Sequence, residues 1–231
     1  MTTTRLLYVT DPLCLWCYGI SSIIEEFYQE LPSELVTETI NGGLFPGTKA
    51  KICDKSFRDY LKNASLHVTK LSGKEFSPLF WQLLATPGFA YDTEPSAKAT
   101  VTMKKLAGEK SMMQFMHALQ HAFFVEGKNV MQAEVLATLA KPFGISKQDF
   151  LDFYLSDECV NLTKQEYAEA SQLGVQGFPA ILYLYGRQGF KLAAGFSTLE
   201  NLKKGLDWAK YECKQADLSI QGLCTDEGCS V

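Results

Sequence analysis

Residues 6–20 join a strand-type segment to a helix-type segment through a pair of cysteines. An apolar, β-rich run ends at Asp11 and a following proline, and Cys14 and Cys17 come next with Cys-x-x-Cys spacing. From Ile20 onward, apolar residues recur with the period of an amphipathic helix. The segment therefore predicts a strand, a turn and a helix, with both thiols at the start of the helix.

The position of the two cysteines predicts redox chemistry. The first N–H groups of a helix lack internal partners and carry partial positive charge, so they favour a thiolate at Cys14. Cys17 lies one turn further along and can attack a mixed disulfide formed on Cys14. We expect Cys14 to be the attacking thiol and partly exposed, and Cys17 to be the buried, resolving thiol.

Metal binding and simple core packing are the alternative interpretations of these cysteines. Cys-x-x-Cys is also half of a zinc site, but two further ligands at regular spacing are not found nearby. His117 and His121 stand four apart, yet the stripe that contains Met112 and Met116 places both on the opposite, solvent side of their helix. We therefore predict no metal site, and a core-filling role for the methionines.

Composition excludes several functional classes. The 231 residues are 46% hydrophobic, enough for a substantial core, and the net charge of −4 provides no basic surface for nucleic acid or membranes. No run reaches the roughly 18 apolar residues that a membrane span needs. Seven cysteines without a secretory signal indicate redox or metal chemistry, so a cytoplasmic location is expected.

The order of elements predicts an α/β fold with an insertion. Residues 35–40 form a second strand, parallel to the first, which completes a strand–helix–strand unit. From about residue 55 to 173 the pattern is helical, with a break at Gly108 and no convincing strand. A hairpin and a final helix follow. The expected divisions are residues 1–45, 46–173 and 174–213, with a tail at 214–231.

Pro179 opens the strand that follows the helical block. A proline is tolerated there because a first strand residue can dispense with its N–H. A cis Phe178-Pro179 bond is feasible and would expose the Phe178 backbone to an extended substrate, but base rates alone favour an ordinary trans proline.

These motifs together resemble a known family. The Asp11-x-x-Cys14-x-x-Cys17 motif, the helical insertion and the Phe178-Pro179 pair are similar to thioredoxin-fold disulfide oxidoreductases of the DsbA type, in their unexported FrnE-like branch. The resemblance implies a thioredoxin fold whose helical domain is inserted between the second strand and the cis-proline strand. It further implies that Cys14 is the nucleophile, Cys17 the resolving thiol and Pro179 the cis-proline that faces them.

The expected function is thiol–disulfide oxidoreduction or isomerisation of protein disulfides. The residues between the cysteines are Leu15 and Trp16, so no imidazolium supports Cys14, and a strongly oxidising potential is not expected. Trp16, with Phe178 and Pro179, is assigned to substrate binding, although Trp16 could equally be a packing residue. Protein or small-molecule thiols and disulfides are the expected partners; no cofactor is predicted, and glutathione is a candidate redox partner.

Two alternative functions stay open. Kappa-class glutathione transferases and the related isomerases share the fold and the insertion but place serine at the position of Cys14. A zinc-binding or chaperone-like module without catalysis is the non-enzymatic alternative.

The C-terminal tail contains Cys224 and Cys229. Four intervening residues allow these cysteines to close a small loop, so a second redox pair is one hypothesis, and an unstructured end with incidental thiols is the other.

Overall fold

The computed structural model describes the backbone of residues 4–223 and the side chains of residues 4–215. The main sheet contains β1 (Thr4–Thr10), β2 (Val36–Asn41), β5 (Ala180–Tyr185) and β6 (Gln188–Ala194). The helices are α1 (Leu15–Gln29), α2 (Lys55–Ser72), α3 (Pro78–Leu84), α4 (Glu94–Phe124), α5 (Ala133–Ala140), α6 (Lys147–Tyr154), α7 (Asp157–Gln172) and α8 (Leu199–Leu223). Two short strands, β3 (Lys51–Ile52) and β4 (Ala90–Tyr91), and two 3₁₀ turns complete the order.

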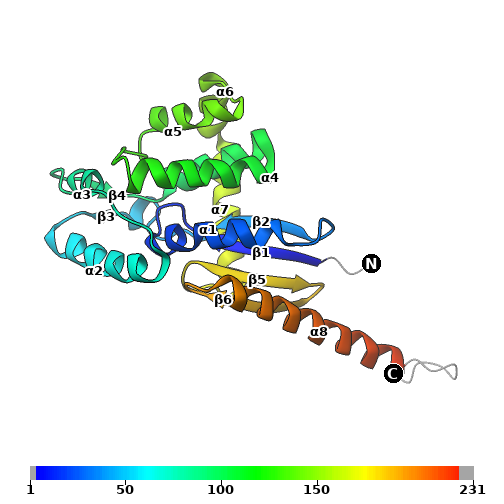
Figure 1. Cartoon of the computed structure of the whole chain (residues 1–231). Helices are drawn as coiled ribbons and strands as arrows, with labels where there is room; N and C mark the ends of the chain where they lie inside the picture. Colours follow the sequence, from blue (N-terminus) through cyan, green and yellow to red (C-terminus); the bar gives the residue numbers. More distant parts are fainter. Residues whose placement is uncertain (1–3, 224–231) are drawn as a thin grey trace.

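The main sheet has the order β2-β1-β5-β6 (Figure 1). Strands β1 and β2 are parallel, and β5 runs antiparallel to both β1 and β6. This confirms the predicted strand–helix–strand unit and the predicted C-terminal hairpin. Because β1 lies in the centre of the sheet, its carboxyl end, where the cysteines follow, is held by neighbouring strands on both sides.

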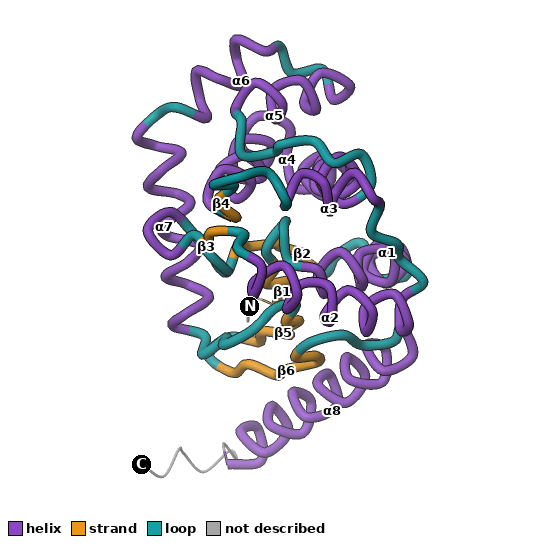
Figure 2. Tube along the Cα trace, turned by 90° about the vertical axis from the view of Figure 1, so that its left-hand side faces the viewer, coloured by secondary structure: helices purple, strands orange, loops and turns teal. Residues whose placement is uncertain are grey.

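Helices cover both faces of this sheet, as the alternation along β1 requires. Leu6 and Tyr8 point into the larger core shared with α1 and α8, whereas Leu7 and Val9 point into a smaller core with Ala170 of α7. Figure 2 shows α7 on one side of the strands and α1 and α8 on the other. The chain is an α/β protein of the thioredoxin type with a helical insertion between β2 and β5.

The inserted helices begin and end where local sequence predicts. Ser146 accepts a hydrogen bond from the backbone N–H of Asp149 at 3.0 Å and so caps the N-terminus of α6, a role that serine often has. Gly108 adopts a left-handed backbone with φ 81°, so α4 is two helical halves joined at a kink, as the break at that residue predicted. Met112 and Met116 are buried in the core, as expected.

The expectation that the block from residue 55 to 173 contains no strand is wrong. Strand β4 pairs antiparallel with β3 through Lys51–Tyr91 and Ile52–Ala90. A two-residue strand is too short to show an alternating pattern, so periodicity could not reveal it. Within the described residues, no helix is both long and apolar enough to span a membrane.

Candidate active site

Cys14 is the N-cap residue of α1, with extended backbone angles of φ −72° and ψ 124°. Its N–H donates to the Asp11 carbonyl at 3.0 Å, and its own carbonyl accepts the first helical bond from Tyr18 at 2.9 Å. The helix therefore begins before Cys17, and the Cys14 sulfur lies at the positive end of the helix dipole, as predicted. Cys14 is only 5% exposed, however, so the expectation of a partly exposed thiol is wrong.

Cys17 lies one turn inside α1 and is fully buried. Burial raises the pKa of its thiol well above the ordinary value, and the neighbouring Cys14 adds to this effect. The hydroxyl of Thr10 opposes the shift, and it also donates a 3.1 Å hydrogen bond to the buried Tyr8 hydroxyl. Both cysteines are free thiols. Cys17 is thus protected from solvent, as a resolving thiol should be.

The segment that precedes β5 faces Cys14 directly. The Phe178-Pro179 peptide bond is cis, and the Cys14 sulfur lies 3.7 Å from the Phe178 carbonyl oxygen. Pro179 itself is buried, and its carbonyl accepts a 2.7 Å hydrogen bond from Gly195. The contact with the Cys14 sulfur therefore comes from the Phe178 backbone.

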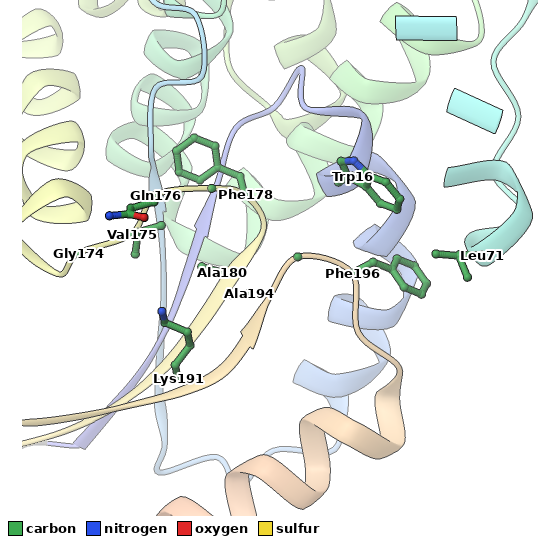
Figure 3. Close-up of a pocket in the computed structure, with 12 residues that line it drawn as sticks. Trp16, Leu71, Gly174, Val175, Gln176, Phe178, Ala180, Lys191, Ala194 and Phe196 are labelled. Atoms are coloured by element: carbon green, nitrogen blue, oxygen red, sulfur yellow. The ribbon is translucent and has the colours of Figure 1, made fainter. Parts of the chain in front are cut away.

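A groove of about 580 Å³ lies beside this contact. Figure 3 shows Trp16 at the start of α1, with Leu71 and Phe196 close to it, and residues 174–178 along the opposite side. Among the residues that the structure describes, Lys191 of β6 is the one charged residue of its lining. Trp16 therefore lines the groove beside the dithiol and also packs against the main core, so contact with a substrate and core packing both stay open as its role.

Two residues that hold the cysteine loop were not assigned a role from sequence. The buried Asp11 carboxylate accepts hydrogen bonds from the backbone N–H groups of Leu13 at 3.0 Å and Leu44 at 2.8 Å. The Tyr91 hydroxyl, from β4, donates to the Leu13 carbonyl at 2.6 Å. Asp11 belonged to the motif itself and could have been recognised as a turn residue. Tyr91 carries no local signal, because it is 78 residues away from its partner.

The sequence model of the DSBA-like thioredoxin domain matches residues 83–207, which is more than half of the chain. This chain belongs to the DSBA-like family. The matched region runs from α3 into α8, so it includes the insertion and the segment with Pro179 but does not include Cys14 and Cys17.

Solved structures place the same fold over nearly the whole chain. A putative protein disulfide isomerase from Nitrosomonas europaea is 29% identical, with a TM-score of 0.80, and the match covers 90% of this chain and 98% of that one. The cytosolic disulfide reductase DsbM from Pseudomonas aeruginosa is 24% identical, with a TM-score of 0.69 and coverage of 93% and 99%. The probable DsbA oxidoreductase from Streptomyces coelicolor is 16% identical, with a TM-score of 0.64 and coverage of 99% of both chains. The search of curated proteins found no match.

The remaining sequence candidates lie outside this site. Among the residues that the structure describes, no group of three or more His, Cys, Asp or Glu side chains could hold a metal ion. The His121 side chain is 60% exposed, as expected, but that of His117 is only 26% exposed, so its assignment to a solvent face is wrong. The packing of α1 beside α4 covers it, which no pattern within α4 could show. Cys224 and Cys229 lie outside the described residues.

The Phe178 ring rests on Gly42, and this contact provides a test of its role in substrate binding. A Cβ on Gly42 would lie 1.8 Å from the ring, so Gly42→Ala must displace the ring, which is the movable end of a side chain. We expect Gly42→Ala and Phe178→Ala to lower kcat/KM for a peptide disulfide to a similar extent, roughly tenfold, if the ring buries against the peptide. Steady-state kinetics would measure the change.

Gly205→Ala is the matched control, because an added Cβ there makes only ordinary contacts, from 3.5 Å outward. Its kcat/KM should equal that of the native protein. If Phe178→Ala or Gly42→Ala leaves kcat/KM unchanged, the Phe178 ring takes no part in substrate binding.

Proposed function

We propose that this protein is a thiol–disulfide oxidoreductase that reduces protein disulfides through Cys14 and Cys17 and is itself reduced by glutathione. The observation that carries the proposal is the position of the Cys14 sulfur, at the N-terminus of α1 and 3.7 Å from the exposed turn that ends at Phe178. A substrate lying in the adjacent groove would bring its disulfide against this sulfur.

The reaction proceeds by two thiol–disulfide exchanges. The Cys14 thiolate attacks one sulfur of the substrate disulfide, which forms a mixed disulfide and releases the other sulfur as a thiolate. Cys17 then loses its proton and attacks the Cys14 sulfur, so the substrate leaves fully reduced and a Cys14–Cys17 disulfide remains. Two glutathione molecules restore the dithiol and leave as glutathione disulfide, which balances the two electrons transferred.

Two features support the reductive direction. Leu15 and Trp16 between the cysteines provide no cationic side chain that would stabilise the reduced form selectively. Among the structural relatives, DsbM from Pseudomonas aeruginosa is a cytosolic disulfide reductase, and one of its structures contains glutathione. A cytoplasmic location of this protein is part of the proposal, because the glutathione pool there is reducing.

The proposal is tested by glutathione-dependent reduction of a peptide disulfide, followed with glutathione reductase. We expect turnover that saturates with glutathione and a Cys14–Cys17 potential between about −200 and −270 mV, the range from glutaredoxins to thioredoxin. In this proposal Lys191, in the lining of the groove, pairs with a carboxylate of glutathione. Lys191→Ala should therefore raise the KM for glutathione up to about fivefold, because an exposed charge pair contributes less than about 1 kcal/mol. Lys204→Ala on the exposed face of α8 is the control and should leave KM unchanged.

A potential near −120 mV, which is typical of a strong oxidant, would contradict the reductive direction. Absence of any glutathione-dependent turnover would contradict glutathione as the reductant.

A further inference from the structure

The second exchange of the proposed reaction requires Cys17 to lose its proton without contact with solvent. Its side chain is fully buried, and burial disfavours the charged form of a thiol. Once Cys14 has formed a mixed disulfide, its sulfur carries no negative charge and can no longer accept a hydrogen bond from the Cys17 thiol as a thiolate would. A group that stabilises the Cys17 thiolate must therefore lie inside the protein.

Two polar groups at the end of β1 face the Cys17 sulfur. The hydroxyl of Thr10 and the backbone N–H of Asp11 both hydrogen-bond to it. Thr10 is itself only 1% exposed, so bulk water does not compete for its hydroxyl. Hydrogen bonds that a charged sulfur accepts favour the thiolate over the thiol. The end of β1 thus presents two donors to the sulfur that has to become an anion.

Thr10 has a second hydrogen-bond partner on its own strand. The alternation of β1 places Tyr8 and Thr10 on the same face of the sheet, and the Thr10 hydroxyl donates to the buried Tyr8 hydroxyl at 3.1 Å. A hydroxyl group rotates to suit its partner. The Thr10 hydrogen therefore has one acceptor for each state of Cys17: the Tyr8 oxygen beside the thiol, and the sulfur itself beside the thiolate.

The charged and titratable groups around this hydroxyl are engaged elsewhere. Burial raises the pKa of Tyr8 well above its ordinary value, so Tyr8 stays a neutral phenol. The Asp11 carboxylate accepts hydrogen bonds from two backbone N–H groups of neighbouring loops. On the α4 side, Lys104 forms an ion pair with Glu166 at 2.5 Å. Thr10 is thus a neutral donor whose charged neighbours are already paired.

We propose that the Thr10 hydroxyl stabilises the Cys17 thiolate during the second exchange, and that Tyr8 accepts this hydroxyl while Cys17 is protonated. The inference rests on the proposed function, because it concerns one step of that reaction. The Cys17 thiolate attacks the Cys14 sulfur, the bond between Cys14 and the substrate breaks, and the substrate sulfur leaves with the electron pair of that bond. The proton that Cys17 releases ends on the substrate sulfur. Thr10 keeps its own proton throughout, so it acts as a hydrogen-bond donor and not as a base.

Thr10→Val tests this role, because valine nearly keeps the shape of the side chain and removes the hydroxyl. Reduced protein is mixed with glutathione disulfide, quenched with acid at successive times, and analysed by peptide mass mapping. We expect the Cys14–glutathione mixed disulfide to form at the native rate and to accumulate, because its conversion to the Cys14–Cys17 disulfide slows by roughly five- to tenfold at pH 7. A hydrogen bond to an anion favours that anion by more than about tenfold, and the greater nucleophilicity of a thiolate with a higher pKa offsets part of the loss.

The pH dependence of the second exchange separates an effect on the thiolate from a loss of packing. Without the donor the pKa of Cys17 rises, so the native rate should level off at a lower pH than that of Thr10→Val. The ratio of the two rates should therefore shrink as the pH is raised from 7 toward about 10, whereas a packing defect lowers the rate by the same factor at every pH. Thr10→Ser keeps the hydroxyl and should restore most of the native rate.

Thr102→Val is the matched control, because it removes a hydroxyl that lies 3.5 Å from another buried sulfur, that of Cys159. Both exchanges should keep their native rates in this variant. A native rate of the second exchange in Thr10→Val would overturn the role of Thr10 and leave the dithiol chemistry intact. A slowed exchange that is reduced equally at every pH and that Thr10→Ser does not restore would also overturn it. If the native protein forms no mixed disulfide on Cys14, the proposed function fails, and this inference fails with it.

Discussion

Replacing Cys14 by serine is expected to abolish turnover, lowering kcat/KM for disulfide substrates by at least about a thousandfold. The Cys14 sulfur is the one placed at the N-terminus of α1 and against the Phe178 carbonyl, whereas Cys17 is fully buried. A serine hydroxyl at neutral pH cannot replace a thiolate as the attacking group. Steady-state reduction of a peptide disulfide would measure the loss.

Cys17→Ser separates the two roles. With the attacking thiol present and the resolving thiol absent, the first exchange proceeds and the second cannot, so a mixed disulfide between Cys14 and the substrate should accumulate. Intact-mass analysis under non-reducing conditions would detect it. Cys159→Ser is the matched control, because this buried cysteine lies against Thr102 and Lys98, away from the groove, and should turn over normally. Accumulation of the mixed disulfide on Cys17 in the Cys14→Ser variant would invert the assigned roles.

Asp11 is expected to make the stability of the fold depend on pH below neutrality. Burial raises the pKa of its carboxyl from 3.8 to about 6, and the hydrogen bonds from Leu44 and Leu13 offset only part of that shift. Between about pH 4 and pH 6 the folded protein keeps this proton while the unfolded chain releases it. The contribution of Asp11 to the free energy of unfolding is therefore greatest below pH 4 and falls as the pH rises through 6.

Comparison with Asp11→Asn, which does not titrate, isolates this contribution. From pH 4.5 to pH 7.5 the free energy of unfolding of the native protein should fall by about 2 kcal/mol relative to that of Asp11→Asn. Urea unfolding at both values measures the difference. Asp207→Asn, at an exposed position of α8, should show no such change relative to the native protein. A difference between native protein and Asp11→Asn that is constant with pH, or that changes in the opposite direction, would contradict the raised pKa.

Asp11 also connects stability with the site. Its carboxylate holds the backbone of Leu13, the residue just before Cys14, and joins this loop to Leu44 after β2. Tyr91 holds the Leu13 carbonyl from the side of the insertion. The loop that carries Cys14 is thus held by two segments that are distant in sequence, one after β2 and one at β4.

The sequence by itself determined the elements that depend on local patterns. The apolar run before Asp11 and the helical period after Cys17 specified β1, α1 and the position of the thiols at the helix start. Ser146 and Gly108 specified a cap and a break, because capping and left-handed backbone are properties of a few neighbouring residues. The roles proposed for Cys14 and Cys17 rest on their three-residue spacing at the start of one helix.

Only the tertiary structure decided how distant segments meet. The contact between Cys14 and Phe178 spans 164 residues, and that between Tyr91 and Leu13 spans 78. The near-complete burial of Cys14 and the partial burial of His117 arise from elements packed against them, not from their own helices. The periodicity of apolar residues indicates which side of a helix is apolar, but it does not indicate which other element of the fold covers the polar side. For that reason the contact of α1 with His117 carried no signal in the sequence.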